Sequence, residues 1–233
     1  GNGVATFKTD LKPGNYTVTF TVAGSDNYKM ATSNGTLSIA DDRIATALTA
    51  ANPTVYLQAI EKGSNYQITL KDDSGKAIAG KEITVSFNGA TYKATTDANG
   101  IATVTLKATK TGSLKATISF AGDDTYKAAS KTATVKITKE ASKITAKKKT
   151  FKAKTKTKKY AITLKSKSGK AIKKVKVTIK VKGKTYKATT NSKGKATFKI
   201  TKLTKKGKHT ATVKFAGNKY FNKASKKVKI TIK

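Results

Sequence analysis

Hydrophobic and polar residues alternate along most of this chain, in short runs that are separated by turn residues. Residues 83–87 read ITVSF, so apolar and hydroxyl-bearing side chains fall on opposite faces of an extended strand. An Asn-Gly pair follows and predicts a hairpin, whose returning strand is the hexapeptide TYKATT at 91–96. A turn at 97–100 and another alternating strand at 101–106 complete the segment. The pattern predicts antiparallel strands with one buried face.

This segment recurs later in the chain. Residues 175–200 repeat the pattern of 80–106, and TYKATT returns letter for letter at 185–190. A partial third copy opens the chain, because residues 2–7 match residues 99–104. The period is about 95 residues, roughly the size of one immunoglobulin-like sandwich, which is large enough to bury its own core. The chain is therefore predicted to be a tandem repeat.

Each whole repeat contains about seven short strands with a turn every 8–12 residues, which predicts an all-β fold of tandem Ig-like antiparallel β-sandwiches. In the first whole repeat Pro53 interrupts the first strand, and we expect its two parts, 46–50 and 54–60, to lie in different sheets. In the partial copy we expect strands at 4–9, 16–23 and 36–39. The predicted units are a C-terminal half of a truncated Ig-like repeat (1–40), an Ig-like repeat (41–138) and a Lys-rich Ig-like repeat (139–233).

Charge separates the two whole repeats. Residues 139–233 contain 34 lysines and one acid, a net charge of +33, whereas residues 1–138 carry a net charge of +4. The period-2 rule places many of these lysines on the solvent faces of both sheets. The candidate polyanion-binding residues are Lys176, Lys180, Lys199, Lys214, Lys227 and Lys229.

Two interpretations of the lysines remain open: a surface that only keeps the protein soluble, and a surface that binds a polyanion. The near absence of opposing acids favours binding, because a net charge of +33 on one repeat repels itself. Nucleic-acid readers use arginine forks and exposed aromatic rings, but the only arginine is Arg43 and the aromatic residues alternate inward. We therefore expect anionic cell-envelope polymers as partners, and nucleic acid to bind only non-specifically.

The remaining candidate sites have simpler explanations. The single histidine, His209, shares its repeat position with Tyr16 and Leu114, so we interpret it as a packing residue, with a tyrosine corner in the first copy. The acidic pairs at 72–73 and 123–124 suggest calcium, but the last repeat has Ser-Lys and Asn-Lys at these places, which favours solvated turn carboxylates. There is no cysteine and no local catalytic constellation, so we expect neither enzyme activity nor a cofactor or metal.

Two covalent modifications also fit the sequence. A self-formed Lys–Asn isopeptide bond needs a buried carboxylate nearby, and Glu140 is the only one in the last repeat. Asn15 and Asn34 each begin an N-glycosylation tripeptide, but such tripeptides arise readily by chance in a threonine-rich chain.

Two turn motifs carry a family resemblance. The pattern Thr-(Asp/Asn)-x-x-Gly-x-Ala stands at 96–102 and 190–196, and Phe-Ala-Gly-(Asp/Asn) stands at 120–123 and 215–218. These resemble tandem bacterial Ig-like repeats of the invasin/intimin kind, and most closely the repeats of adhesin-like surface proteins from methanogenic archaea. The resemblance covers essentially the whole chain and implies that the Lys-rich repeat is the C-terminal end of such a protein.

The preferred functional hypothesis is a non-enzymatic, extracellular stalk of spacer repeats at the cell surface, whose basic last repeat retains the protein on an anionic envelope or cell wall. The alternatives are a polyanion- or nucleic-acid-binding β-domain, or domains appended to a secreted enzyme. No apolar run reaches the ~18 residues of a membrane span. Because the first repeat is cut in half, we expect the chain to be part of a longer protein.

Overall fold

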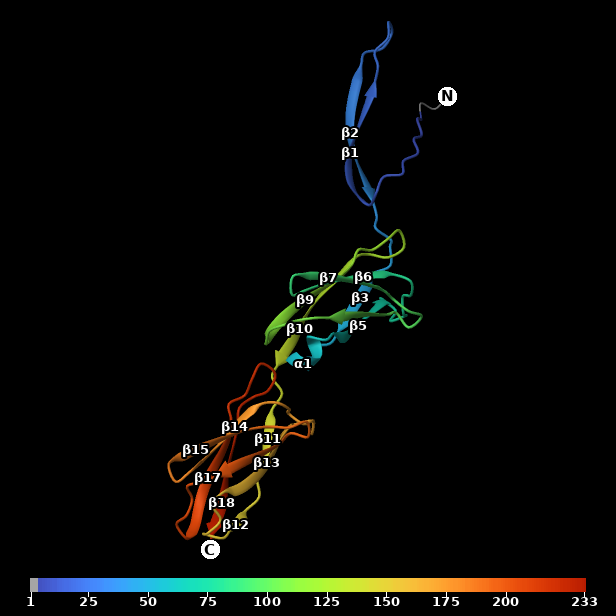
Figure 1. Ribbon diagram of the computed structural model, residues 1–233. Helices are drawn as coiled ribbons and strands as arrows, with labels where there is room; N and C mark the ends of the chain where they lie inside the picture. Colours follow the sequence, from blue (N-terminus) through green and yellow to red (C-terminus); the bar gives the residue numbers. More distant parts are fainter. Residues whose placement is uncertain (1–3) are drawn as a thin grey trace.

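The computed structural model describes residues 4–233 and is elongated, with three parts in line (Figure 1). A two-stranded hairpin lies at one end and two β-sandwiches follow it. In the described residues no helix is long and apolar enough to span a bilayer. The predicted all-β, tandem sandwich fold is confirmed, whereas the unit boundaries at 40/41 and 138/139 stay a prediction.

The first sandwich consists of two sheets. Its elements are β3 (Thr46–Ala50), β4 (Thr54–Tyr56), α1 (Leu57–Ile60), β5 (Ser64–Asp72), β6 (Glu82–Phe87), β7 (Ala90–Thr95), β8 (Ile101–Leu106), β9 (Gly112–Phe120) and β10 (Ala129–Thr138). One sheet has the order β3-β5-β8 and the other β4-β10-β9-β6-β7. Neighbouring strands are antiparallel except for β4 and β10, which are parallel.

The second sandwich has the same topology. Its strands are β11 (Ser142–Thr145), β12 (Lys149–Phe151), β13 (Lys158–Ser166), β14 (Lys176–Val181), β15 (Lys184–Thr189), β16 (Lys195–Ile200), β17 (Gly207–Phe215) and β18 (Ala224–Ile232). The sheets are β11-β13-β16 and β12-β18-β17-β14-β15, and β12 is parallel to β18.

The predicted sheet change at Pro53 is confirmed, because β3 and β4 lie in different sheets. The predicted strand at 54–60 is wrong beyond Tyr56, where residues 57–60 form the single turn α1. Leu57 and Ile60 are both buried by this turn. A helical turn places residues three apart on one face, so it buries both side chains where an alternating strand would expose one of them.

Each sandwich has its own core of inward-facing residues. Buried aliphatic and aromatic side chains from both sheets form one cluster in each sandwich. A buried tyrosine makes the same hydrogen bond in each sandwich. The Tyr66 hydroxyl donates to the Ala51 carbonyl, and the Tyr160 hydroxyl donates to the Lys147 carbonyl, both at 2.7 Å. Because a buried hydroxyl needs a partner, this bond fixes the first strand against the second.

The N-terminal hairpin reproduces the last two strands of a whole repeat. It consists of β1 (Gly14–Val22) and β2 (Ala31–Ile39), and it is paired in the register of β9 with β10. Its apolar face is open, with Phe20 49% and Val22 63% exposed. The predicted strand at 4–9 does not form, and its continuation into residues 1–3 lies outside the described residues. In a whole repeat that strand is β8, which pairs with β5, and residues 4–40 contain no counterpart of β5.

Candidate anion-binding surface

The outer face of the five-stranded sheet in the second sandwich carries most of the predicted lysines. They are exposed at alternate positions, between buried residues such as Val177 and Val228. This arrangement brings together Lys176 and Lys180 of β14, Lys214 of β17, and Lys227 and Lys229 of β18. Lys199 lies on β16 in the opposite sheet, so the sixth predicted residue is separated from the other five. We call the five-stranded outer face the lysine face.

Lysines and hydroxyl residues lie opposite each other across the strands of the lysine face. Lys180 lies opposite Thr185 on one side and Thr212 on the other, and Thr212 lies opposite Lys227. The same alternation holds for the pairs Lys176–Thr189, Thr178–Lys187, Thr178–Lys214, Lys214–Ser225, Thr210–Lys229 and Lys208–Thr231. Each lysine in these pairs therefore has a hydroxyl residue directly opposite it on a neighbouring strand, and we call this cross-strand alternation the checkerboard.

Two lysines of this checkerboard, Lys187 and Lys208, are absent from the predicted set. Lys187 lies in the TYKATT hexapeptide, which occurs in both whole repeats. A comparison of the two repeats therefore does not identify Lys187 as a residue that the basic repeat has gained. Lys208 comes directly after the turn that precedes β17, and only the pairing of β17 with β18 shows which face it shares. Cross-strand register is the missing information in both cases.

The checkerboard reduces repulsion between neighbouring charges. Like charges directly opposite each other in a sheet are destabilising. Diagonal neighbours such as Lys180 and Lys214 have Cα atoms ~8 Å apart from strand geometry alone, and their flexible side chains can spread further. This distance is about one Debye length at physiological ionic strength. The lysine face can therefore hold many charges at moderate cost.

The opposite face of the second sandwich is arranged differently. In the three-stranded sheet Lys143 lies directly opposite Lys165, and Lys159 lies directly opposite Lys199. The two outer faces of this sandwich are both basic, but the strand pairs of the lysine face set no two of its outward lysines directly opposite each other.

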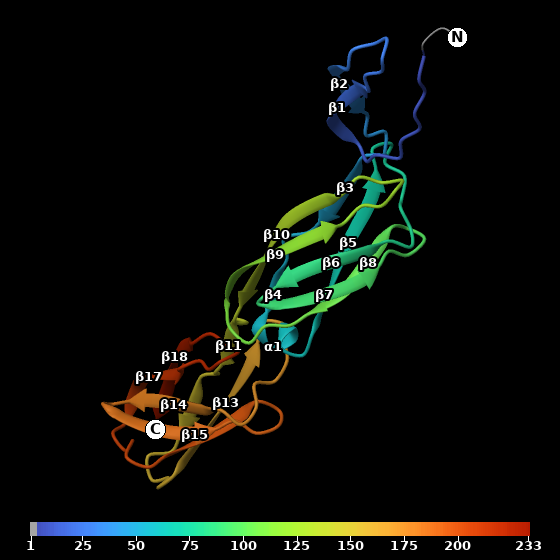
Figure 2. The same ribbon diagram turned by 90° about the horizontal axis from the view of Figure 1, so that it is seen from above.

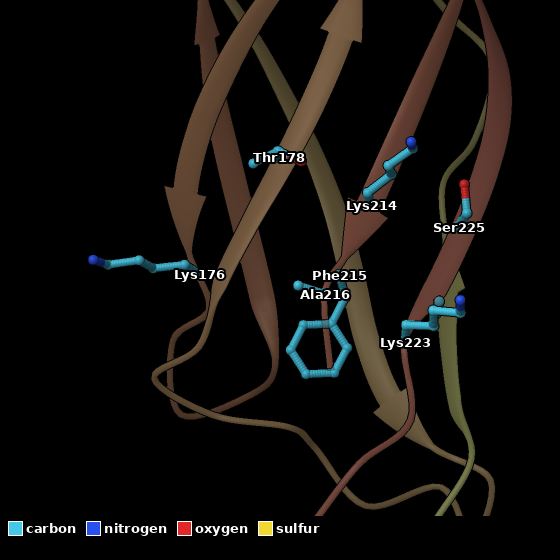
Figure 3. A pocket seen from close by; sticks show the side chains of 8 residues that line it. Lys176, Thr178, Lys214, Phe215, Ala216, Lys223 and Ser225 are labelled. Atoms are coloured by element: carbon cyan, nitrogen blue, oxygen red, sulfur yellow. The ribbon is translucent and has the colours of Figure 1, made fainter. Parts of the chain in front are cut away.

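A groove of about 760 Å³ lies at one end of the lysine face (Figure 3). Its floor includes the buried Phe215, and its walls carry three lysines from β14, β17 and the segment before β18. In Figure 3 the side chain of Lys176 points away from those of Lys214 and Lys223. Thr178 and Ser225 also line the groove, and each lies directly opposite Lys214 on its neighbouring strand. The groove is thus an apolar depression with a cationic rim.

His209 is a packing residue in the structure. Its Nε2 lies 2.7 Å from the Lys205 carbonyl oxygen, and because a carbonyl only accepts, Nε2 carries the proton. Tyr16 makes the equivalent bond in the N-terminal hairpin, where its hydroxyl donates to the Lys12 carbonyl at 2.8 Å. This is the predicted tyrosine corner, with histidine in place of tyrosine in the last repeat. Among residues 4–233 no three His, Cys, Asp or Glu side chains gather as metal ligands.

The acidic pairs of the first sandwich organise turns. The Asp72 carboxylate accepts from the Ser74 hydroxyl and the Lys76 amide, and the Ser74 bond first of all holds the pKa of Asp72 below its ordinary value. Asp123 accepts two backbone amides and pairs with Lys81 at 2.7 Å, which likewise lowers its pKa.

The last repeat keeps these turn acceptors without the charge. Asn218 replaces Asp123, and its Oδ1 accepts the amides of Tyr220 and Phe221 at 2.9 Å each. Asn191 replaces Asp97 at the turn before β16 in the same way. An amide oxygen is enough for an Asx turn, so the turn does not require a carboxylate.

Glu140, the one acid of the last repeat, lies against a turn. It is buried, and its Oε1 accepts the Ser168 amide at 2.8 Å. Burial acts to raise the pKa of Glu140, but hydrogen bonds from Ser168 and Ser166 outweigh it and hold that pKa below its ordinary value. Ser166 stands where the first repeat has Asp72, so Glu140 supplies the carboxylate that this turn has lost. Glu140 therefore has a structural role that does not depend on an isopeptide bond.

Comparison with known proteins identifies the repeat. Residues 61–138 match the bacterial Ig-like domain (group 1). No curated protein is significantly similar to the chain. Similar solved structures include a bacterial ice-binding adhesin of 1.5 MDa, with 16% identity, a TM-score of 0.38, and coverage of 94% of this chain and 75% of that one.

Two further structures have somewhat higher identity. Invasin, a bacterial integrin-binding protein, is 22% identical with a TM-score of 0.43, over 81% of this chain and 39% of that one. The D0-D1 domain of intimin is 22% identical with a TM-score of 0.33, over 79% of this chain and 97% of that one. The strand orders and the family match agree, and the chain is a tandem of Ig-like β-sandwich repeats, one of which matches the bacterial Ig-like domain over residues 61–138.

Proposed function

We propose that these repeats are non-enzymatic spacers of an adhesin-like protein at the cell surface, and that the last repeat retains the protein on an anionic envelope by charge. The family match of the first whole repeat and the in-line arrangement of the three parts support the spacer role. The proposal extends to the C-terminal end of an archaeal adhesin-like protein, on the resemblance of the turn motifs.

One observation carries the retention role. The two sandwiches share topology, core and turn chemistry, yet the net charge is +33 in residues 139–233 and +4 in residues 1–138. Because the turns need only oxygen acceptors, the exchange of acids for neutral residues leaves them intact while it removes the charges that would neutralise the lysines. The fold does not require this basic surface, so we assign it to a partner of opposite charge.

The contact between the two sandwiches supports the spacer role. Glu61 follows α1 at the end of the first sandwich, which lies next to the second in both views (Figures 1 and 2). Its carboxylate pairs with Lys219 and accepts the Tyr220 hydroxyl at 2.6 Å. Tyr220 also packs against both cores. These contacts favour one extended orientation, as a stalk needs.

A competition experiment tests the retention role. The full chain is incubated at ~0.15 M salt with isolated cell-envelope fragments, and random duplex DNA is titrated as competitor. We expect the envelope to retain the protein, because a small non-specific DNA contact loses most of its affinity as salt rises. If DNA displaces the protein efficiently, or if one DNA sequence is preferred, the nucleic-acid alternative replaces envelope retention.

A further inference from the structure

We propose that the lysine face is the contact surface of the last repeat and that its ligand is an extended acidic polysaccharide. The inference rests on the proposed retention by charge, and it replaces diffuse attraction with one face and one chemical class of polymer. The checkerboard of ammonium and hydroxyl groups carries it.

The first step concerns the hydrogen-bonding capacity of the checkerboard. A lysine ammonium group only donates, whereas a threonine hydroxyl group both donates and accepts. Lys229 shows that the two groups reach each other, since its Nζ donates to Thr210 Oγ1 at 2.7 Å. Linear polyphosphate offers only acceptors, so it cannot donate a hydrogen bond to a hydroxyl oxygen of this face. A polysaccharide with carboxylate and hydroxyl groups can satisfy both kinds of group on this face.

The second step excludes recognition of nucleic-acid bases. Base readout uses arginine forks and base stacking uses exposed rings. Residues 139–233 contain no arginine. The aromatic residues nearest to the lysine face point inward, since Phe215 is buried and Tyr186 is half-buried. A flat array of lysines without rings fits a ligand that contacts it through charge and hydroxyl groups alone.

The third step concerns the shape of the ligand. The charges spread over four neighbouring strands, from Lys187 on β15 to Lys229 on β18, so one small anion cannot contact them all. An extended chain can cross the strands and meet a lysine at every second strand, ~10 Å apart. The groove beside Phe215 lies at one end of this path, and its apolar floor suits the hydrophobic side of a sugar ring.

The first sandwich offers the same face with fewer charges, since Lys93, Lys115 and Lys136 remain on it and Glu82 pairs with Lys93. Ser86, Thr117 and Thr132 lie side by side on its five-stranded sheet, at the places of Lys180, Thr212 and Lys227. Its outer face is therefore dominated by hydroxyl groups. The chain thus contains a less charged counterpart of the proposed surface, on the same strand framework.

The first test compares two variants of the full chain that lose the same charge from different faces. The probe is polygalacturonate, with polyphosphate as the phosphate control, and the measured quantity is Kd at fixed salt. The lysine-face variant is Lys180→Gln, Lys214→Gln, Lys227→Gln and Lys229→Gln, and the opposite-face variant is Lys159→Gln, Lys165→Gln, Lys195→Gln and Lys199→Gln. All eight lysines are exposed.

We expect the lysine-face variant to bind polygalacturonate about thirty-fold more weakly, from four exposed ion pairs of typical strength. The opposite-face variant should lose less than about threefold, through long-range charge alone. Equal losses in the two variants would overturn the face assignment and leave retention by diffuse charge in place. If the unaltered chain binds no polyanion, the proposed retention itself fails.

The second test keeps net charge and composition constant. The exchange Thr212→Lys with Lys214→Thr moves one lysine so that it lies directly opposite Lys180 and Lys227. We expect weaker polygalacturonate binding, by about fivefold, and unchanged polyphosphate binding, because the exchange alters pattern and not charge. The melting transition confirms that the variant is folded. Unchanged polygalacturonate binding in the folded variant, or tighter binding of polyphosphate than of polygalacturonate by the unaltered chain, would overturn the polysaccharide assignment.

Discussion

The two sandwiches differ most where the first strand crosses from one sheet to the other. In the first sandwich the turn α1 buries Leu57 and Ile60. In the second a loop takes its place, and the fully buried side chain of Lys158 fills the space. Its ammonium group donates to the Thr155 carbonyl at 2.7 Å and the Ala153 carbonyl at 3.4 Å. The comparison shows that alternating apolar and polar residues and a few hydrogen-bond acceptors in the turns maintain this topology. Other positions can change from apolar to charged side chains.

The glycine that precedes β8 and β16 is one position that cannot change. Gly100 has φ +72°, and a Cβ there would lie 2.5 Å from the Leu70 carbonyl oxygen; Gly194 has the same φ and faces Leu164. Gly100→Ala and Gly194→Ala should each lower the unfolding free energy of their sandwich by about 3 kcal/mol or more, from strain and backbone contact together. Denaturant titration measures the loss.

Gly89→Ala is the matched control, since Gly89 has φ +77° but no atom within 4 Å of the added Cβ. It should cost about 1 kcal/mol from backbone conformation alone. A loss at Gly100 no larger than at Gly89 would show that the turn adapts to the side chain.

Lys158 should be as important to the second sandwich as an apolar core residue. We expect Lys158→Ala to lower the unfolding free energy by about 3 kcal/mol, because it leaves a cavity and removes the donor for the Thr155 carbonyl. Lys158→Met, which retains most of the volume, should cost about 1 kcal/mol. Ser64, the residue that begins β5 as Lys158 begins β13, provides the comparison: Ser64→Ala should change stability by less than about 0.5 kcal/mol. Similar costs for Lys158→Ala and Ser64→Ala would contradict the proposed role.

Salt should affect the two sandwiches differently. From 0.01 to 0.15 M salt the Debye length falls from ~30 to ~8 Å, which screens repulsion among the lysines of the second sandwich. Its melting temperature should rise by about 4 °C, equivalent to about 1 kcal/mol, while that of the first sandwich hardly changes. Calorimetry of the full chain measures both transitions, and Gly100→Ala identifies the first. A second transition that stays constant or falls with salt would show that the lysines repel one another less than we argue.

The smallest effect concerns the contact between the sandwiches. The Lys219 ion pair, and then the Tyr220 hydroxyl, hold the pKa of Glu61 below its ordinary value of 4.5. Because the pKa is lowered in the folded protein, the contact is fully formed above pH 4.5 and is lost as the pH falls through the lowered value. Small-angle scattering should show a broader distribution of chain dimensions at pH 3 than at pH 7.

Glu61→Gln should give the broader distribution at both pH values, whereas Glu82→Gln, which removes an exposed pair with Lys93 within the first sandwich, should leave the pH response unchanged. Equal dimensions at both pH values in the unaltered chain would mean that Tyr220 packing alone holds the orientation.

Sequence alternation predicts the sandwich fold and the exposure of the lysines, because both depend only on the period of the strand. It does not predict which sheet a lysine joins, so it cannot separate Lys199 from the five residues of the lysine face. That assignment, and the checkerboard, depend on strand order and register between residues far apart in sequence. The sequence pattern does not predict the turn α1, because four mostly apolar residues fit a buried strand as well as a helix. One sequence signal does point to Glu140 as a turn acceptor. Ser166 stands where the first repeat has Asp72, so the turn after β13 lacks the carboxylate that accepts hydrogen bonds after β5.

The parallel pairing of β4 with β10 and of β12 with β18 has a mechanical consequence. In each sandwich the strand near the beginning of the repeat runs alongside the strand at its end, over three residue pairs. Tension along the chain pulls these two strands in opposite directions, so their hydrogen bonds are loaded together in shear rather than broken one after another. A repeat of this kind resists stretching until the whole patch yields at once, which suits the proposed spacer role.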